Sequence, residues 1–523
     1  MKRLGHGEVK KSAVSPQGLA PQGIAAASNG DPQRTVDSFG FMINDWTTAE
    51  KLPNGAQTLV QLRALGSAMK DQDGEQSDSG IPAAYTYFGQ FVDHDITHDT
   101  TSATLPELAG QALLPLPDLS GLRNDRTAAT ELDSVYFLGV PREQANKNRL
   151  RLSDVSKLGG IATPNLRPVG KKDANDLPRQ ARHVDKDEDR AAIIGDPRND
   201  ENTIVAQMHT AFLKAHNSLV DGGLNFDEAR REMILRYQSV ILDDFLKRIC
   251  HRQTYERIRA NGPTFWKLAD GKQLFMPVEF AFAAYRFGHS MVRTQYDFNL
   301  NFNLSGETNT FPAGLDLLFT FTALSGGFNA GGGNGTDTLP ENWIIEWERI
   351  LPMGNGSQVQ NAHAIDVQLT NFLFALRNKL GDSEGSEPGT PPAVKELAPI
   401  LATRNLLRGF MIGLPTGQAV ARRMGIAPLE GQALLDALPT QALKDAATPF
   451  QDRSPLWFYV LAEAGSSSGG GGRTLGEVGS TLVTETLFML IRHSEVSILR
   501  KPDNKRPSTT LAEIIALAAR QDA

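Results

Sequence analysis

Apolar residues recur every three or four positions over much of this chain, which is the spacing of one face of an α-helix. The pattern is clearest at 203–220 (TIVAQMHTAFLKAHNSLV), 227–250, 396–412 and 474–499. Asp227, which opens the second of these segments, is a candidate N-cap. Segments in which apolar and polar residues alternate, as in a half-buried strand, are few and short. The pattern therefore predicts a mainly α-helical fold.

Polar and glycine-rich segments lie between the helical ones. Residues 1–36 are rich in Pro, Gly, Ser and Lys and predict a mobile arm. The glycine-rich segments 326–335 and 465–472 predict flexible surface loops, and the polar segment 168–188 also predicts a loop. No long linker interrupts the rest of the chain. We therefore expect a single large helical domain with long irregular loops at 37–523.

Composition narrows the class of protein. The 523 residues carry a formal net charge of −7, which gives no support to nucleic-acid binding. The single cysteine, Cys250, rules out an intrachain disulfide framework and is expected to be a buried thiol. No apolar segment is long enough to span a membrane. The N-terminus lacks the apolar stretch of a Sec-type signal peptide, so we expect a cytoplasmic protein, with secretion by non-Sec export as the alternative.

Residues 85–99 (YTYFGQFVDHDITHD) concentrate chemically active side chains. On a helix, Gln90, Asp93 and His94 would share one face, whereas Asp95 would point about 100° away. One interpretation is a distal haem pocket beside a calcium site. A second is a zinc site, because His94 and His98 have the spacing of a zincin helix, although a zincin has Glu where this chain has Asp95. A third is a polar helix end with hydrogen-bonded histidines.

Further motifs resemble those of the animal-type haem peroxidases, the peroxidase–cyclooxygenase superfamily. Along the chain they are GQFVDHD, RTAATELDSVY, GDPRNDEN, MHTAFLKAHN, YRFGHS and RNLLRG, followed by a closing segment LGEVGSTLVTETLFMLI. They occur in the order of the family and cover about residues 60–500. The resemblance implies a haem peroxidase domain that binds haem b and Ca²⁺ and reduces hydrogen peroxide. Such a protein could serve in a response to oxidative stress.

The resemblance assigns roles on the distal side of the haem. His94 would move a proton between the two peroxide oxygens, since an imidazole can act as base and then as acid near neutral pH. Arg198 would stabilise the negative charge that develops on the departing oxygen. Gln90 would hold water and halide. Asp93 and Glu201 match the positions that form ester bonds to haem methyl groups.

The resemblance also assigns the proximal side. His289 would be the axial iron ligand, and Asn405 would hydrogen-bond its other ring nitrogen. Arg286 and Arg408 fall where the family holds the haem propionates. Asn202 replaces a methionine that forms a sulfonium bond in some members. We therefore expect bromide, iodide, thiocyanate or small phenols, rather than chloride, as the electron donor.

A calcium site is expected beside the distal helix, because Ca²⁺ binds six to eight oxygen ligands. Asp95 leaves that helix on the side away from the haem. Thr127, Ala129 (by its carbonyl), Glu131 and Asp133 alternate along a loop, so that successive odd residues can face one side. By resemblance these five residues bind the ion. Glu131 stands where the family usually has Asp.

Three other functions remain open. A fatty-acid dioxygenase of the same superfamily would need a Tyr three residues before His289, where this chain has Arg286; Tyr285 is one position too early. A non-catalytic haem- or calcium-binding protein is the second alternative, and a zinc hydrolase is the third. His209 and His216, which share a helix face, are interpreted as hydrogen-bonded core residues rather than metal ligands.

Overall fold

The computed structural model describes most of the chain. The described residues are 38–71, 77–99, 104–110, 112–137, 139–157, 175–184, 188–268, 274–306, 310–322, 336–354, 356, 358–376, 389–502 and 505–522. The arm predicted at 1–36 and the glycine-rich loop predicted at 326–335 lie outside these ranges, as do parts of 168–188. The predicted domain boundary at residue 37 therefore stays a prediction.

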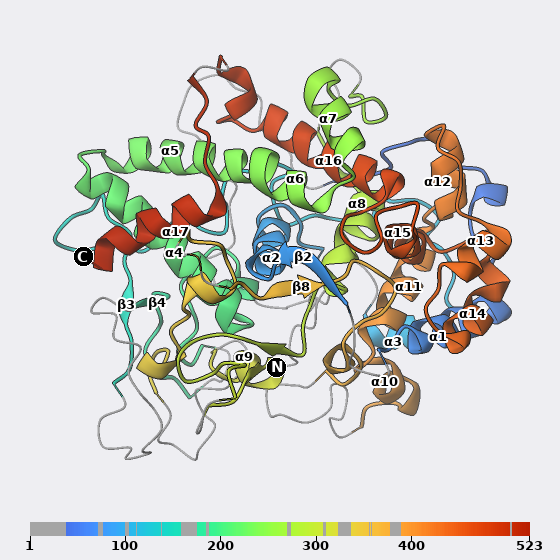
Figure 1. Cartoon of the computed structure of the whole chain (residues 1–523), viewed down its shortest axis with the longest axis horizontal. Coiled ribbons are helices and arrows are strands. Elements are labelled where there is room, and N and C mark those ends of the chain that lie inside the picture. The colour runs from blue at the N-terminus through green and yellow to red at the C-terminus, as the bar shows by residue number, and fades with distance from the viewer. Residues whose placement is uncertain are drawn as a thin grey trace.

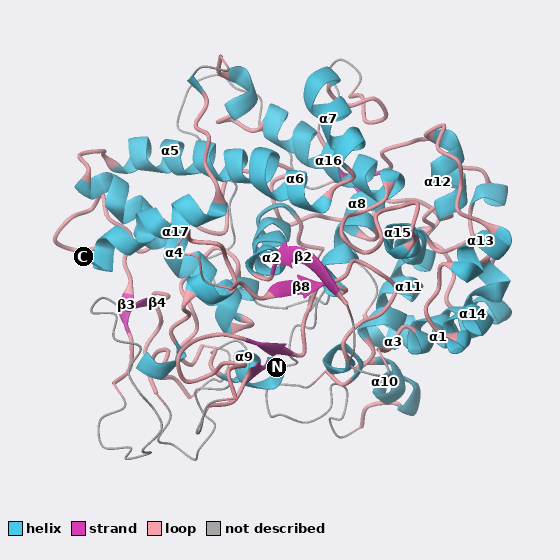
Figure 2. Cartoon of the chain, in the orientation of Figure 1, coloured by secondary structure: helices cyan, strands magenta, loops and turns pink. Residues whose placement is uncertain are grey.

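Helices dominate the described part of the chain, which confirms the mainly α-helical fold (Figures 1 and 2). The α-helices are α1 (Ala56–Ala68), α2 (Ala84–Ile96), α3 (Leu105–Ala109), α4 (Thr203–Asp221), α5 (Phe226–Ser239), α6 (Leu246–Ile249), α7 (Arg252–Asn261), α8 (Val278–Ala281), α9 (Leu315–Thr320), α10 (Pro392–Leu397), α11 (Leu401–Ile412), α12 (Gly417–Arg423), α13 (Gly431–Asp436), α14 (Gln441–Ala447), α15 (Leu456–Gly465), α16 (Glu477–His493) and α17 (Leu511–Ala519).

Short strands tie together segments that are distant in sequence. The parallel pair is β1 (Phe39–Gly40) with β5 (Met276–Pro277), and the antiparallel pairs are β2 (Asp78–Pro82) with β8 (Asn361–His363), β3 (Ser153–Asp154) with β4 (Asn175–Asp176), and β6 (Gln295–Tyr296) with β7 (Ala313–Gly314). Three short 3₁₀-helices contribute to the wall of the central cavity: η2 (Pro197–Asp200), η4 (Ala284–His289) and η8 (Asn371–Phe374).

Helix α2 lies in the middle of the molecule, with α4, α8 and α16 around it (Figure 1). It packs against α4, η2, η4 and β8. Phe88 and Phe91 on α2 are fully buried, and the Phe91 ring lies 4.7 Å from the Phe212 ring of α4. These aromatic contacts fix the helix in the core, so the side chains on its last turn, including His94, have defined positions.

Helix α4 confirms the prediction for 203–220 and is buried along almost its whole length. Its first turn is capped by Asn202, whose Oδ1 accepts a hydrogen bond of 3.0 Å from the backbone N–H of Val205. Because α17 packs against it as well as α2 and α5, its polar residues are enclosed and must find partners inside the protein.

The second predicted helix, at 227–250, begins earlier and changes pitch. Its N-cap is Asn225, not Asp227 as predicted, because Asn225 and Glu228 form a capping box that starts the helix two residues sooner. The helix passes through a π-helical turn, η3 (Val240–Phe245), before α6. Such a turn changes the direction of the side chains that follow it, and Phe245 reaches the cavity described below.

Two other predicted helices are shorter than the apolar pattern implied. The segment 396–412 is broken between α10 and α11, where Pro399 supplies no backbone N–H. The segment 474–499 forms α16, which ends at His493. The glycine-rich segment 465–472 is a closed turn instead of an open loop, since the carbonyl of Ser466 accepts three consecutive glycine N–H groups.

Cys250 is a buried free thiol, as expected, and burial raises its pKa to about 12. Among the described residues, no helix combines the length and the apolar character that crossing a membrane requires.

Candidate active site

One large cavity lies between α2 and η4 and encloses about 1200 Å³, counting the part that is open to solvent. Ligand and cofactor sites are typically concave and mostly apolar with a few polar groups, and this cavity combines apolar side chains such as Phe282 and Leu315 with the polar residues expected in the site. Six residues expected in the site line it: Gln90, Asp93, His94, Arg198, Arg286 and His289. Asn405, Glu201 and Arg408 are buried but do not belong to its lining.

His94 lies on the last turn of α2 and is 1% exposed. Its Nδ1 is 2.8 Å from Oδ1 of Asn199. An amide oxygen only accepts hydrogen bonds, so Nδ1 of His94 carries the proton. In the neutral imidazole Nε2 is then the acceptor. The sequence did not single out Asn199, which immediately follows Arg198.

Arg198 reaches the cavity wall from η2. Its Nη2 donates to the Asp196 carboxylate and to the Thr97 carbonyl, both at 2.7 Å. Burial opposes its charge, but the attraction of Asp196 outweighs that effect and raises the pKa of the guanidinium. Among the described residues no hydrogen bond involves Nη1, so this nitrogen can serve a ligand in the cavity.

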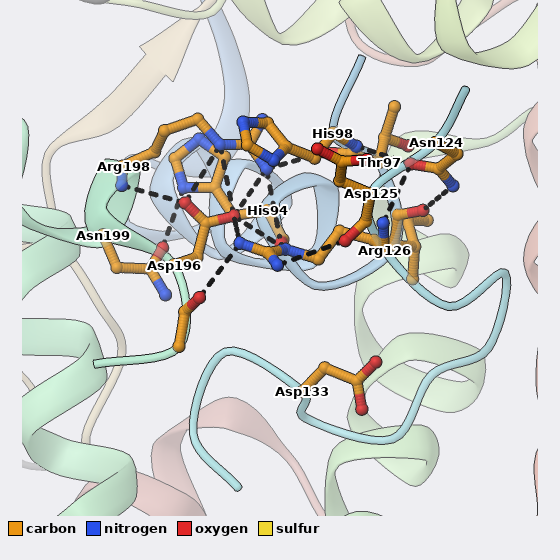
Figure 3. Close-up of polar contacts among 12 residues, drawn as sticks. His94, Thr97, His98, Asn124, Asp125, Arg126, Asp133, Asp196, Arg198 and Asn199 are labelled. Atoms are coloured by element: carbon orange, nitrogen blue, oxygen red, sulfur yellow. Dashed lines mark hydrogen bonds and ion pairs between the residues drawn. The ribbon is translucent and has the colours of Figure 1, made fainter. Parts of the chain in front are cut away.

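Asp196 anchors a network that sequence analysis did not detect (Figure 3). It is fully buried between Arg126 and Arg198, with carboxylate–guanidinium distances of 2.6 and 2.7 Å. Burial would raise its pKa, but the two guanidiniums hold the pKa well below its ordinary value. Arg126 and Arg198 also donate to the backbone carbonyl of His94, so the network fixes the end of α2.

Gln90 is held by two residues at the start of α4. Its Nε2 donates to the Glu201 carboxylate at 2.6 Å, and its Oε1 accepts from Nδ2 of Asn202 at 3.2 Å. Asn202, noted in the sequence only for its lack of sulfur, therefore both caps α4 and orients an amide in the cavity. Glu201 is brought beside Gln90, while Asp93 lines the cavity itself.

His289 closes the cavity on the other side and has a chain of polar partners. The 3₁₀ geometry of η4 places residues three apart on one side, so Arg286 and His289 are neighbours. Nη1 of Arg286 donates to Oδ1 of Asn405 at 2.8 Å, and Nδ2 of Asn405 lies 3.1 Å from Nδ1 of His289. Arginine can only donate, which turns the amide NH₂ of Asn405 toward His289. Nδ1 of His289 is the acceptor in this arrangement.

The predicted calcium loop lies against α2. Asp95 is fully buried, and its Oδ2 accepts from the backbone N–H of Leu132 at 3.2 Å. Thr127 donates to the carboxylate of Asp133. Burial raises the pKa of both Asp95 and Asp133, and the negative charge of Asp133 adds to the shift of Asp95. The carboxylate of Glu131 accepts from the backbone N–H of Glu495.

The zinc interpretation lacks further ligands in the structure. His98 lines the same cavity as His94, but within the described ranges no group of three or more His, Cys, Asp or Glu side chains could hold a metal ion. His209 and His216 are hydrogen-bonded core residues, as predicted: His209 contacts Asn199, and His216 contacts the Tyr136 hydroxyl.

Comparison with known proteins agrees with this geometry. Residues 123–329 match the family model "Animal haem peroxidase", a range that contains Arg198 and His289. A peroxidase-like protein of Margaritifera margaritifera is 27% identical over 263 residues, which is 40% of this chain and 32% of that protein. The chain thus spans about a third of the length of this relative.

Solved structures share the fold at low sequence identity. Peroxidase A of Dictyostelium discoideum is 15% identical, with a TM-score of 0.55 and 92% coverage of both chains. The fatty acid α-dioxygenase of Arabidopsis thaliana is 12% identical, with a TM-score of 0.52 and coverage of 90% of this chain and 76% of its own. The rice enzyme is also 12% identical, with a TM-score of 0.54 and coverage of 90% and 79%. Residues 123–329 of the chain thus match the animal haem peroxidase family model, and the chain shares its fold with solved structures of a peroxidase and of fatty acid α-dioxygenases.

Proposed function

We propose that this protein is a haem peroxidase that reduces hydrogen peroxide and oxidises a small electron donor. The observation that carries this proposal is the placement of His94 and Arg198 on one side of a single cavity and His289 on the other. The residues present fit haem b: an imidazole for the iron, a half-buried Arg286 for a carboxylate, and apolar walls that include Phe282 and Leu315. Bound haem would supply the iron at which peroxide is reduced.

The distal side chains are arranged for proton transfer. Because Nδ1 of His94 is engaged with Asn199, Nε2 is the nitrogen that can take a proton from peroxide and return it to the leaving oxygen. Arg198, fixed by Asp196 and the Thr97 carbonyl, would place positive charge beside that oxygen without having to reorganise. Gln90 would hold water or a halide through its amide.

The proximal side needs one rearrangement to bind iron. Coordination through Nε2 of His289 requires the proton on Nδ1, and Asn405 would then have to present its oxygen. Arg286 donates to that oxygen now. We propose that Arg286 turns to a haem propionate and thereby releases Asn405 to accept from His289. Arg408 would hold the other propionate.

We also propose which residues attach the haem and which electron donors the protein oxidises. Asp93 and Glu201 are the carboxyl groups that would hold the haem periphery, and an ester bond from either to a haem methyl group would require hydrogen peroxide as the two-electron oxidant, with two protons lost to water. The position of Asn202 offers no sulfur for a further bond, which favours bromide, iodide, thiocyanate or small phenols over chloride as donors. The motifs resemble those of peroxidases, and the solved peroxidase and α-dioxygenase structures, at 15% and 12% identity, both share the fold.

A dioxygenase is the second candidate because Tyr285 lines the cavity. Its hydroxyl is buried and has no hydrogen-bond partner among the described residues. However, the 3₁₀ geometry places Arg286, rather than Tyr285, on the side of His289. This arrangement favours the peroxidase.

We also propose that Ca²⁺ binds between Asp95 and the loop that carries Thr127, Ala129, Glu131 and Asp133. In the described residues these three carboxylates do not yet form a metal-binding group, because the Glu131 carboxylate accepts from the Glu495 N–H, so Glu131 would have to turn toward the ion. Two carboxylates that share a buried space repel each other, and a cation would relieve this repulsion. Chelation of Ca²⁺ should lower the Tm of the haem-loaded protein, and added Ca²⁺ should restore it. An Asp95→Asn variant should show little response to either treatment, and equal responses in both proteins would contradict the site.

The function is tested by two assays on the haem-loaded chain: peroxide with bromide, iodide or guaiacol, and linoleate with oxygen. We expect turnover only in the first assay. His94→Ala should slow the first reaction with peroxide by at least ~10²-fold, the usual scale of general acid–base catalysis. His183→Ala is the matched control, because His183 lies outside the cavity lining with its side chain 48% exposed, and this variant should stay within a few-fold of the wild type. Oxygen consumption with linoleate, or equal losses in the two variants, would overturn the proposal.

A further inference from the structure

We propose that Asn199 is a positioning residue that fixes the tautomer of His94, and that His209 holds the Asn199 amide from the other side. This inference rests on the role proposed for His94 as the base. The two imidazoles are bridged by one amide: Oδ1 of Asn199 lies 2.8 Å from Nδ1 of His94, and Nδ2 lies 3.0 Å from Nδ1 of His209.

The amide can serve the two histidines in only one way at a time. An asparagine side chain has one acceptor and two donors at opposite ends. With Oδ1 toward His94, Nδ1 of His94 must donate, and its Nε2 is left as a base. If the amide turned over, Nδ1 of His94 would have to accept and Nε2 would carry the proton. The orientation of Asn199 therefore decides whether His94 can take a proton from a substrate.

His209 is suited to hold the amide in the productive orientation. It is 1% exposed on α4, and burial lowers its pKa to about 3, so it is neutral at ordinary pH. A neutral imidazole can accept the Nδ2–H of Asn199 at its Nδ1. Its ring stands edge-on to Phe91 of α2, with ring centroids 5.9 Å apart and an interplanar angle of 82°.

The Asn199 amide, which bridges the two histidines, is positioned by the backbone of η2 and not by the histidines themselves. Asn199 is fully buried, and its N–H donates to the Asp196 carbonyl at 3.0 Å. The Asp196 carboxylate binds Arg198 in the same turn. One short turn thus supplies both the guanidinium that faces the cavity and the amide behind His94 (Figure 3).

The proton balance of the proposed step is simple. The peroxide O–H proton moves to Nε2 of His94, which becomes an imidazolium, while Nδ1–H stays hydrogen-bonded to Asn199. The same proton then passes to the other peroxide oxygen, which leaves as water when the O–O bond breaks. The bound haem would supply the two electrons, and the electron donor would replace them. Asn199 and His209 exchange no proton. They act by keeping Nε2 unprotonated before the step.

The direct test is the tautomer of His94 in the full chain without haem, measured by ¹⁵N NMR with histidine labelling. In the wild type the proton should be on Nδ1 of His94. It should leave Nδ1 in Asn199→Leu, which removes the acceptor, and stay there in Asn199→Asp, which retains one. His209→Leu should give a mixture of tautomers.

His216→Leu is the matched control, because His216 is also a buried, hydrogen-bonded histidine of α4 and has other partners. This variant should leave the His94 signals unchanged. A proton on Nε2 of His94 in the wild type, or the wild-type pattern in Asn199→Leu, would overturn the proposal. If Asn199→Leu fails to fold, His209→Leu decides: wild-type His94 signals in that variant would overturn the role of His209.

The reaction with peroxide gives a second, separate readout on the haem-loaded protein. Asn199→Leu should slow the first step by ~10²-fold, because the base is lost, and Asn199→Asp should recover most of the rate. If the wild type does not react with peroxide at all, the proposed function fails while the NMR result on Asn199 still stands.

Discussion

At the scale of single residues, the site depends on a buried anion. Asp196 has no exposed surface and holds two guanidiniums, which in turn bind the carbonyls at the end of α2. A buried ion pair is a weak source of net stability, but loss of one partner leaves an uncompensated buried charge. The geometry of Arg198 in the cavity therefore depends on Asp196.

Asp196→Asn should lower the free energy of unfolding by about 3–5 kcal/mol, the usual cost of removing one partner of a buried pair. The measurement is chemical denaturation at neutral pH. Asp337→Asn is the matched control, since Asp337 pairs with Arg182 at the surface, where the side chains are 67% and 50% exposed. That control should cost less than about 1 kcal/mol. Equal losses would show that Asp196 has no special role.

Six of the residues singled out from the sequence motifs line one cavity, and the roles assigned to them stay predictions. The partners were harder to predict. Arg126 and Asp196 are 70 residues apart in sequence, and no periodicity connects them. Asn199 could have been suspected from the GDPRN turn, since its neighbours on both sides are charged. The orientation of the Asn405 amide depends on the hydrogen bond that Arg286 donates to it, and only the structure shows this contact.

At the scale of elements, the start of α4 is joined to the cavity through Asn202. Its Oδ1 caps the helix, and its Nδ2 orients Gln90 on α2. One side chain thus serves both the stability of α4 and the placement of a cavity amide. A variant of the N-cap residue of another helix can separate the effect on helix stability from the effect on Gln90.

Asn202→Ala should lower the free energy of unfolding by about 1 kcal/mol, as loss of an N-cap does. It should also raise the KM for the electron donor, because the Gln90 amide becomes free to rotate. Asn225→Ala, the cap of α5, should cost a similar free energy and leave this KM unchanged. Denaturation and steady-state kinetics measure both. A KM that shifts equally in the two variants would contradict the role of Asn202.

Apolar periodicity predicted the existence of the long helices and missed their interruptions. The π-helical turn at 240–245 and the 3₁₀ turn at 284–289 keep the apolar pattern of an α-helix, so composition does not reveal them. The break at Pro399 follows from its missing N–H and could have been predicted. The helix start at Asn225 could also have been found from the Asn-x-x-Glu spacing.

At the scale of the whole molecule, the segment that follows the first described strand, β1, is held in place by a buried acid. Glu279 on α8 is fully buried, and its carboxylate accepts from the backbone N–H groups of Met42 and Ile43. Burial raises its pKa from 4.5 to about 7, although these hydrogen bonds oppose the shift. In the unfolded chain the group would ionise at its ordinary pKa.

The sign of the pH effect follows from that difference. Below pH 4.5 the raised pKa contributes its full stabilisation, and the contribution is lost as pH rises through 7. The unfolding free energy of the wild type, relative to Glu279→Gln, should therefore fall by roughly 3 kcal/mol between pH 4.5 and 7, at 1.36 kcal/mol per pKa unit. Denaturation curves across this range measure it. Parallel pH profiles for the two proteins would contradict the account.

The central claim, that the cavity binds haem for reaction with peroxide, is tested most directly by one absorption measurement. The spectrum of the haem-loaded full chain is recorded before and immediately after addition of one equivalent of hydrogen peroxide. If haem binds in the cavity beside His94 and Arg198, its Soret band should shift rapidly with peroxide and recover when iodide or a small phenol is added. A chain that gives no Soret band with haem, or a band that peroxide does not move, would contradict it.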